Sequence, residues 1–401
     1  MRQLLFLCLL ILSANLYSQI LGASDKIGFP QLSEQAEISV ITCGPGEAVY
    51  EAFGHSAFRI RDPKLGIDRV YNYGIFDFNT PNYYLKFAQG NLLYLLGSGD
   101  FFFFIKSYQY QNRWVKAQVL DISSREVQAC FDYLENNALP KNRAYLYDYF
   151  FDNCSTRLYD VINAILGEQL QLPALFEENP KTHRQLIQPY LTDQSWGDFG
   201  IDIALGSVID RGVTMKEFLF LPENVLTFFD DLKIKKDGIT KNIVKRTEVI
   251  LKDTNRKTTD TYLTPFMLFA IIGLIVVVIT RKNIKSHLRT KWLDFTLFFS
   301  FGLMGLVLTF ISFATNHASA ANNFNILWAF TPNLVVSFVL LKSKLPKWFS
   351  YYLLFLLILI GVVCILWIFK VQIFSNALLP ILIFLSVRYV YLYKLGRTVE
   401  S

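Results

Sequence analysis

The sequence predicts an α+β domain outside the cytoplasm, followed by a bundle of five transmembrane helices. Of the 401 residues, 52% are hydrophobic, and the mean hydropathy of +0.31 is higher than that of soluble domains. The apolar residues are also unevenly distributed. Short strand-like and helix-like patterns alternate up to about residue 258, whereas long apolar runs dominate the remainder, so the chain divides into two parts.

Residues 1–19 have the form of a secretory signal peptide. Arg2 precedes an apolar run from Leu4 to Leu12, and small or polar residues follow up to a cleavage position near Ser18. The run is too short to cross a bilayer, and an uncleaved signal anchor is the alternative. The expected parts of the chain are therefore a signal peptide at 1–19, an extracytoplasmic domain with a helical C-terminal part at 25–258, a transmembrane domain at 259–393 and a cytoplasmic tail at 394–401.

Four segments of the extracytoplasmic part have the composition and alternation of strands, namely 38–43, 55–60, 69–76 and 115–122. A helix is expected to follow the last of them, at 124–134. Beyond Gly167 the chain is interpreted as mostly helical, with several prolines, up to residue 231. The charged residues crowded between 233 and 257 are interpreted as a helix or a linker next to the membrane.

Cys154 lies where a helix is expected to begin. Asp152 or Asn153 is suited to cap that helix, and apolar residues recur at helical spacing over 158–165 before Gly167 ends the run. The unpaired N–H groups of a first helical turn and the positive end of the helix dipole favour a thiolate and could hold an oxyanion. The alternative is a small buried residue that fills a helix end, because free cysteine is among the most buried residue types.

His55, in the segment AFGHSAFRI, is the candidate partner for Cys154. Phe58 and Ile60 alternate as they would in a strand, so His55 is expected at the start of that strand. A histidine on a strand beside a cysteine at a helix start is the arrangement in which an imidazole takes a thiol proton. A structural, hydrogen-bonded histidine is the alternative.

A third residue could orient the imidazole. Asn72 and Tyr73 lie on the strand expected at 69–76, and either could serve as the third member of a triad. Asp77 is a further candidate, although an acid directly before 79–81, Asn-Thr-Pro, is typical of a turn.

An aromatic and aliphatic block, NYYLKFAQGNLLYLLGSGDFFFFIKSYQYQNRW, occupies 82–114. Such a surface next to a reactive thiol could accept acyl chains or lie at a bilayer surface. Because a domain of this size must bury residues of this kind, we interpret most of the block as core strands and a helix.

Five apolar runs in the second part have roughly the length needed to cross a bilayer. The third is the shortest and contains Pro332. The five runs are Tyr262–Thr280, Leu293–Phe313, Asn325–Leu341, Tyr351–Phe369 and Phe374–Val390.

The charges of the connecting loops orient these runs. Lys and Arg lie in 281–291, in 342–347 and in the C-terminal tail, whereas 315–323 has no charge, so alternate loops are expected in the cytoplasm. The domain that carries Cys154 is then outside the cytoplasm, as the signal peptide also indicates. The net charge of +6 follows this distribution and does not form a patch of the kind that binds nucleic acid.

Three motifs in this order resemble a known family. GHSAFRI at 54–60, VYNYGIFDF at 70–78 and DNCSTRLYD at 152–160 resemble the extracytoplasmic domain of the Lnb-type lipoprotein N-acyltransferases. That domain is similar in core to the papain-like NlpC/P60 and lecithin:retinol acyltransferase domains, and in permuted members of this clan the histidine precedes the cysteine, as it does here. The resemblance covers most of 38–160, and a similar membrane region follows.

The resemblance implies a permuted papain-like fold and an enzyme of the bacterial inner membrane, with its catalytic domain in the periplasm. Cys154 and His55 would be its catalytic residues. The reaction it implies moves an acyl chain from a membrane phospholipid, through a thioester on Cys154, to the α-amine of a diacylglyceryl lipoprotein. No cofactor or metal is expected, because no zinc-ligand spacing, phosphate-binding loop or pair of catalytic carboxylates is recognisable.

Further polar residues are candidates for holding an oxyanion or contacting the substrate. They are Asn153, Ser155 and Arg157 beside the cysteine, together with His317 and Asn325 in the uncharged loop NHASAANNFNILW at 316–328. The loop is expected on the same side of the membrane as Cys154 and loosely resembles the polar loop that follows the second span in the Lnb family. An ordinary uncharged loop with an interfacial tryptophan is the alternative.

Three cysteines, Cys43, Cys130 and Cys154, are expected to face an oxidising compartment. An odd number leaves one thiol free, and we expect that thiol to be Cys154. If a disulfide exists, it is expected between Cys43 and Cys130.

Two other classes of function fit parts of the sequence. A cell-wall amidase or peptidase of the NlpC/P60 kind would use the same pair of residues, but five spans argue against it because an amidase needs at most one anchor. A non-enzymatic membrane binding module would leave the position of Cys154 without a role. An acyl chain on Cys154, a cleaved muropeptide or neither product would separate the three.

Overall fold

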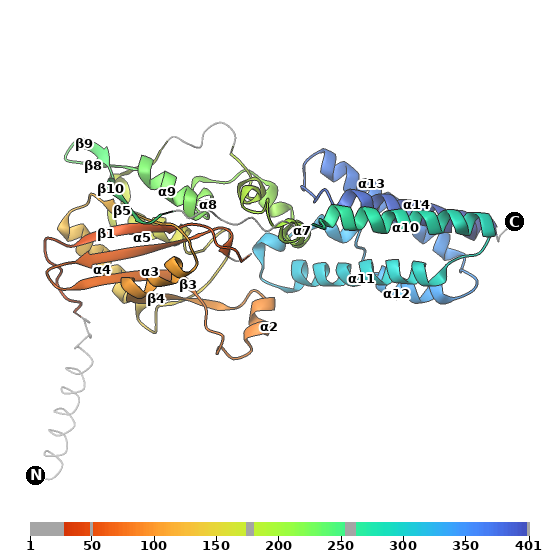
Figure 1. The fold of residues 1–401 in the computed structure, drawn as a ribbon, viewed down its shortest axis with the longest axis horizontal. Coiled ribbons are helices and arrows are strands. Elements are labelled where there is room, and N and C mark those ends of the chain that lie inside the picture. The colour runs from red at the N-terminus through yellow and green to blue at the C-terminus, as the bar shows by residue number, and fades with distance from the viewer. Residues whose placement is uncertain (1–27, 49–50, 174–179, 253–261, 399–401) are drawn as a thin grey trace, which may run out of the picture.

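The computed structural model describes residues 28–48, 51–173, 180–252 and 262–398 (Figure 1). A sheet-rich domain and a helical bundle lie end to end along the long axis of the molecule. The expected signal peptide at 1–19 and the expected boundary at residue 258 lie outside the described residues.

The N-terminal domain is built on a seven-stranded sheet with the order β10-β5-β1-β2-β3-β4-β6, in which every neighbouring pair is antiparallel. The four strands predicted from the sequence are all present. Because β2 and β3 are neighbours, residues at their ends can meet. The strands are β1 (Glu37–Cys43), β2 (His55–Asp62), β3 (Ile67–Ile75), β4 (Leu93–Asp100), β5 (Val115–Leu120), β6 (Ala144–Leu146) and β10 (Val244–Leu251).

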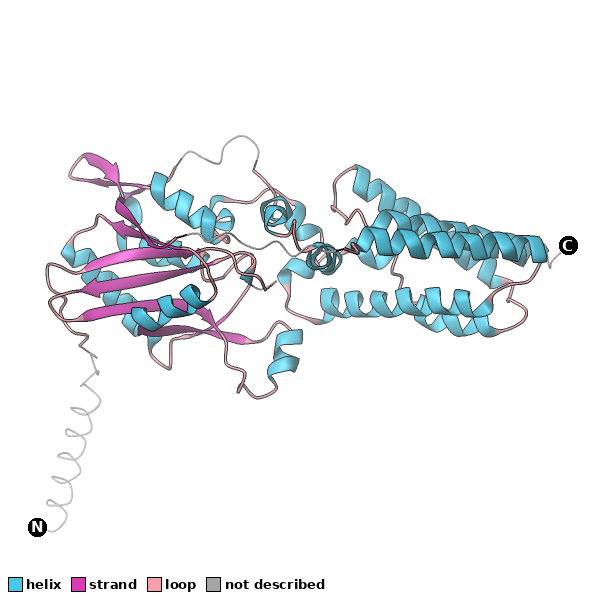
Figure 2. Ribbon diagram, in the orientation of Figure 1, coloured by secondary structure: helices cyan, strands magenta, loops and turns pink. Residues whose placement is uncertain are grey.

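Helices cover both faces of this sheet (Figure 2). On one face, apolar residues of β1, β2 and β3 pack with those of α4 (Ser124–Ala138), α5 (Thr156–Leu166) and α9 (Pro222–Asp231). On the other face, α3 (Phe101–Tyr110) packs through Phe101 and Tyr108. The buried apolar faces on both sides hold the sheet rigid, so it is a firm support for residues at its edge.

In the described part of the charged segment, 233–252, the chain forms strands, whereas the sequence predicted a helix or a linker. It forms β8 (Lys233–Lys236), β9 (Ile239–Asn242) and then β10, and β8 also pairs with β7 (Leu170–Gln171). Asp237 and Gly238 both have positive φ, 50° and 80°, which is the turn that joins two antiparallel strands. The charges alternate along β10 because one of its faces is solvated.

The connection between the sheet and the bundle is mostly helical, as predicted. Its apolar core contains Phe53, Phe150, Ile187 and Phe220. Its elements, with the remaining short helices of the domain, are α2 (Tyr83–Ala88), η2 (Gly167–Gln169), α6 (His183–Ile187), η3 (Gln188–Tyr190), α7 (Ser195–Ala204), η4 (Ser207–Asp210) and α8 (Met215–Phe218).

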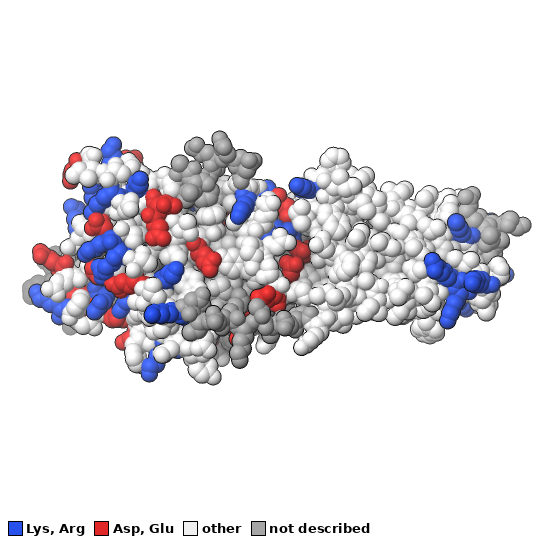
Figure 3. Space-filling model, turned by 45° about the horizontal axis from the view of Figure 1, so that its top comes forward, with Lys and Arg blue, Asp and Glu red and all other residues white. Residues whose placement is uncertain are grey.

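Four helices of the described chain are long and apolar enough to cross a membrane. They are α10 (Pro265–Ser286), α11 (Lys291–Ala314), α13 (Trp348–Ile368) and α14 (Leu378–Thr398). Figure 3 shows their surface to be almost free of charge, with Lys and Arg gathered at the end far from the sheet-rich domain. This distribution agrees with the orientation predicted from the loop charges.

The third predicted run, Asn325–Leu341, is a broken helix and not a continuous one. It consists of η6 (Phe324–Leu327), α12 (Asn333–Val336) and η7 (Ser337–Leu341), after the short η5 (Ala318–Ala320). Pro332 interrupts its hydrogen bonds, and it packs so closely on α11 that a Cβ on Gly305 would lie 1.7 Å from the Ala329 carbonyl. Its two ends nevertheless lie at opposite ends of the bundle, because Asn325 donates to the Asp202 carbonyl at the junction and Arg289 of the basic loop donates to the Leu340 carbonyl.

A buried ion pair ties the long helices together near the basic end. Arg388 of α14 donates to Asp294 of α11 at 2.6 Å and to Asn283 of α10 at 2.9 Å. Both charged side chains are fully buried. Charges inside a membrane region need partners of this kind, so the pair fixes how the three helices pack.

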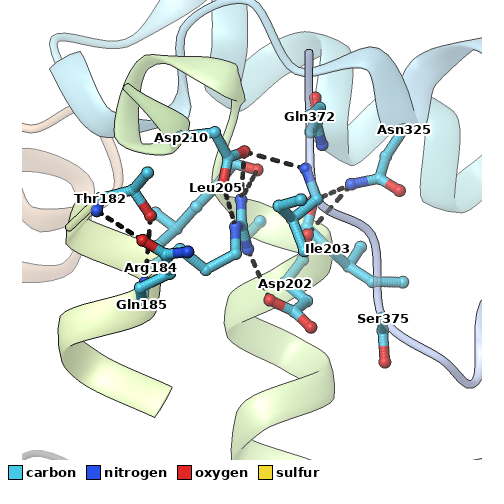
Figure 4. Close-up of polar contacts among 12 residues, drawn as sticks. Thr182, Arg184, Gln185, Asp202, Ile203, Leu205, Asp210, Asn325, Gln372 and Ser375 are labelled. Carbon is cyan, nitrogen blue, oxygen red and sulfur yellow. Dashed lines mark hydrogen bonds and ion pairs between the residues drawn. The ribbon is translucent and has the colours of Figure 1, made fainter. Parts of the chain in front are cut away.

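A second buried ionic cluster joins the N-terminal domain to the bundle (Figure 4). Arg184 of α6 donates to Asp202 of α7 at 2.5 Å and to Asp210 of η4 at 2.7 Å. The second oxygen of Asp210 accepts the N–H of Ile373, which lies between α13 and α14, at 3.2 Å. The cluster therefore fixes the helical connection against the end of the bundle.

Candidate active site

Cys154 lies in the turn that leads into the α5 helix, two residues before its first residue, Thr156. The Asn153 Oδ1 accepts the N–H groups of Ser155 at 2.9 Å and Thr156 at 3.0 Å, and the Asn153 carbonyl accepts the first helical bond, from Arg157, at 3.2 Å. Of the two residues considered as caps, Asn153 is the one whose side chain accepts the N–H groups of this turn, although the helix begins later than expected, at Thr156. The cap fixes the direction in which the Cys154 side chain leaves the chain.

His55, at the start of β2, faces both Cys154 and Asn72. Its Nε2 lies 2.5 Å from the Oδ1 of Asn72 at the end of β3. An amide oxygen only accepts, so Nε2 carries the proton of this hydrogen bond and Nδ1 is left for another partner. The imidazole and the Cys154 thiol are close enough to influence each other's pKa. Cys154 is 7% exposed and His55 is half-buried. The structure thus brings together three residues that are far apart in the sequence.

The electrostatics of this cluster favour an ionised thiol. Burial raises the pKa of Cys154, but the charge and hydrogen bond of His55, with hydrogen bonds from the Ser56 N–H and Ser155, outweigh it and hold the pKa below its usual value. Burial lowers the pKa of His55, whereas Cys154 and the hydrogen bond with Asn72 raise it, and the balance lies above the usual value. Thiolate and imidazolium therefore stabilise each other.

Backbone and small side chains complete the space around the sulfur. The Ser155 hydroxyl donates to the Ser56 hydroxyl at 3.1 Å, which ties the start of α5 to β2. Gly74 at the end of β3 has a φ of 91°, and a Cβ there would lie 3.4 Å from the Tyr147 ring and 3.8 Å from the Cys154 Cβ. Gly74 therefore leaves room between the thiol and Tyr147.

Tyr73 does not take the orienting position that was considered for it. Its hydroxyl accepts a hydrogen bond from Asn137 of α4 at 2.7 Å, and its ring is buried in the core beneath the sheet. Asn72 and Tyr73 are consecutive strand residues, so their side chains point to opposite faces. Asn72 is the one that meets His55.

Two of the residues considered for holding an oxyanion are used structurally instead. The Asn153 amide nitrogen donates to the carbonyls of Tyr149 at 2.8 Å and Phe220 at 2.7 Å, so the side chain has no donor left. Arg157 pairs with both oxygens of Asp152 at 2.5 Å and lies over the Tyr145 ring. These contacts fix the loop that precedes Cys154.

The loop expected to face the site reaches the N-terminal domain, but its two candidates differ. Asn325 is buried, its amide donates to the carbonyls of Asp202 and Ile203 at 3.1 and 3.2 Å, and its oxygen accepts from Trp328 at 2.8 Å. It therefore joins α7 to the bundle (Figure 4) and is not free to contact a substrate. His317 is half-buried, and its side chain acts electrostatically on Asp148, in the loop before Cys154.

The other two cysteines of the domain are buried thiols. Burial raises the pKa of both Cys43 and Cys130 to about 12. All four described cysteines are free, and Cys43 and Cys130 lie in cores on opposite faces of the sheet, so the disulfide considered for them cannot form in this fold.

Sequence reasoning missed several residues near the sulfur. Ser56, Gly74 and Tyr147 belong to the quoted motifs or their flanks, yet their contacts depend on how the strands align. In the sequence, these residues could have been proposed as neighbours of the site only because they lie close in the chain to His55, Asn72 and Cys154.

The fold and this site together define a multi-pass membrane protein with a cysteine–histidine site in its large N-terminal domain. A family model of the Lnb N-terminal periplasmic domain matches residues 32–188, and a model of the Lnb transmembrane domain matches residues 256–398. The chain therefore belongs to the Lnb family, as its motifs suggested. No curated protein and no solved structure matches it. Its N-terminal domain is periplasmic and its helical bundle lies in the inner membrane.

Proposed function

We propose that this protein is a lipoprotein N-acyltransferase in which Cys154 is the nucleophile, His55 the base and Asn72 the residue that orients the base. The observation that carries the proposal is the hydrogen bond between His55 and Asn72 beside a thiol, Cys154, whose pKa the imidazole holds below its usual value. Such a thiol is the nucleophile of acyl transfer through a covalent intermediate.

In the first half-reaction the Cys154 thiolate attacks the ester carbonyl of a phospholipid. The carbon–oxygen bond of the ester breaks, a thioester forms, and the imidazolium of His55 gives its proton to the departing alcohol of the lysophospholipid. Among the described residues the Cys154 amide N–H donates to no backbone acceptor, which supports a role for it as a donor to the oxyanion.

In the second half-reaction the α-amine of a diacylglyceryl lipoprotein attacks the thioester. An amide forms, the carbon–sulfur bond breaks, and the amine proton passes to His55 as the thiolate is regenerated. Both substrates have acyl chains anchored in the bilayer, and a domain held on the outer end of a bundle keeps its nucleophile close to them.

Intact-protein mass spectrometry tests this proposal. Incubation of the purified protein with phospholipid vesicles should add the mass of one acyl chain to wild type and not to Cys154→Ala. Added lipoprotein bearing a free amine should then remove the chain from the enzyme. A protein that never carries an acyl chain but cleaves muropeptides would instead be the amidase considered above, and one that does neither would be a binding module.

A further inference from the structure

The α2 helix and its flanks form an aromatic patch that the domain leaves uncovered. None of the residues of α2 is buried. Phe78 is 67% exposed and Tyr84 is 81% exposed, with Leu85 and Phe87 also exposed. The α2 part of the 82–114 block therefore does not belong to the core that we expected most of the block to form.

The aromatic patch lies at the level where a span leaves the bilayer. The α11 helix ends at Ala314, and two residues later the Asn316 N–H donates to the Gln89 carbonyl at 2.8 Å, while its side chain donates to Asn91 at 2.6 Å. These bonds hold the end of α2 directly against the end of α11, and Figure 1 shows α2 as the part of the sheet-rich half that reaches toward the bundle on that side. Aromatic side chains at this level face the boundary between head groups and acyl chains.

A continuous run of aromatic rings connects this patch to the thiol. The Tyr83 ring of α2 lies 6.2 Å from Phe76, and Phe76 lies 5.7 Å from Tyr94. Tyr94 stacks on Tyr147 at 4.4 Å. Tyr147 in turn borders the space that Gly74 leaves beside Cys154.

We propose that the aromatic patch inserts into the outer leaflet, and that the run from Tyr83 to Tyr147 guides a phospholipid acyl chain to Cys154. The occupant is a leaflet phospholipid because the patch continues the lipid-facing surface of α11, where Phe310 and Phe313 are exposed. Its only charge within α2 is Lys86, which suits the head-group level. The delivery of the acyl chain to Cys154 rests on the proposed function. The insertion of the aromatic patch into the leaflet does not depend on it.

Photo-crosslinking tests the lipid contact without relying on catalysis. In the full chain with Cys154→Ala, p-benzoylphenylalanine replaces Tyr84 or, as a matched control, Phe103. Phe103 is 71% exposed but lies on α3, over the sheet and farther from the bundle (Figure 1). Irradiation in vesicles of labelled phosphatidylethanolamine should give a lipid adduct at position 84 and not at 103. Equal labelling of both positions, or of neither, would overturn the proposal.

A ratio of two rates tests the guiding role. For wild type, the double variant Tyr84→Ser/Phe87→Ser and the control Phe103→Ser, acylation of Cys154 is measured from phosphatidylethanolamine vesicles and from soluble p-nitrophenyl butyrate. The ratio of the vesicle rate to the soluble rate should fall about tenfold in the double variant, because apolar contact with the leaflet is lost, and stay unchanged in the control. An unchanged ratio in the double variant refutes the guiding role. Absence of acylation of wild type from either donor would instead refute the proposed function.

Discussion

The site around Cys154 and the junction around Asn325 looked alike in the sequence but differ in what their polar atoms do. Each combines a histidine with asparagines and lies on the periplasmic side. At the site, thiol and imidazole shift each other's pKa, and the sulfur makes a long contact, of 3.8 Å, with the Ser155 hydroxyl. At the junction, the donors and the oxygen of the Asn325 amide are all committed to α7 and Trp328. A polar residue is available for chemistry only where the fold does not already use its hydrogen bonds.

The largest expected effect separates two buried thiols that both lie near His55. Cys43 is the direct partner of His55 in the pairing of β1 with β2, yet burial raises its pKa to about 12. Cys154→Ala should abolish acyl transfer, a loss of at least about 10³-fold, because it removes the thiolate that forms the proposed covalent intermediate. Cys43→Ala should retain acyl transfer when the activity is counted per folded molecule. Assays of lipoprotein N-termini by mass spectrometry give the result, and loss of activity in the Cys43 variant with a normal melting temperature would contradict it.

The next effect concerns the ionic cluster at the junction. Arg184 is buried between Asp202 and Asp210, so Arg184→Met leaves two acids without their cation and should cost about 3 to 5 kcal/mol of stability. The matched control is Arg211→Met, because Arg211 forms an exposed pair with Glu217 that contributes less than about 1 kcal/mol. Denaturant titration in detergent measures both. Equal losses of stability in the two variants would mean that burial of the Arg184 ion pairs adds nothing to their contribution.

The sequence was sufficient to predict where Cys154 and His55 lie in the fold. Cys154 follows a capping residue and precedes a clear helical pattern, and His55 opens an alternating strand, so local pattern identified both positions. The choice between Asn72 and Tyr73 could not be made, because it depends on which face of β3 meets the end of β2. The role of Asn153 was misjudged because asparagine can serve either as a helix cap or as an oxyanion donor, and the sequence does not distinguish the two.

Long-range packing accounts for the other differences. The charged residues of β10 form a strand because β5 offers an open edge, which local charge density does not reveal. The run at 325–341 has the composition of a span, but close contact with Gly302 and Gly305 of α11 and the proline within it give a broken helix. The exposed side chains of α2 look like core in the sequence because a leaflet and a protein interior select the same residues.

A smaller effect tests whether Asn72 orients the base. Asn72→Ala removes a hydrogen bond that raises the pKa of His55, so the pKa of the imidazole should fall. Because the imidazole is then protonated less often, it stabilises the thiolate less, and the pKa of Cys154 should rise. In the profile of kcat/KM against pH, the acid limb then shifts to higher pH and the alkaline limb shifts to lower pH. The maximum of kcat/KM falls about 10- to 100-fold. Tyr73→Phe is the control, since the hydrogen bond of its hydroxyl within the described chain comes from Asn137 and not from the site, and its profile should match wild type. An unshifted profile in Asn72→Ala would remove Asn72 from the site.

The smallest effect decides whether Asn325 belongs to the junction or to the site. Asn325→Ala leaves the N–H of Trp328 and the carbonyls of Asp202 and Ile203 without their partner, which should lower stability by about 1 to 3 kcal/mol. Transfer per folded molecule should stay within about twofold of wild type, because the side chain has no group left for a substrate.

His317→Ala is the matched comparison on the same loop. The His317 side chain acts on Asp148 through charge, so its removal should change stability less than the removal of the Asn325 amide does. Melting temperature in detergent and the acylation rate from phospholipid vesicles are measured for both variants. If Asn325→Ala keeps its melting temperature but loses transfer more than about tenfold, its amide contacts the substrate, and the distinction between junction and site fails at this residue.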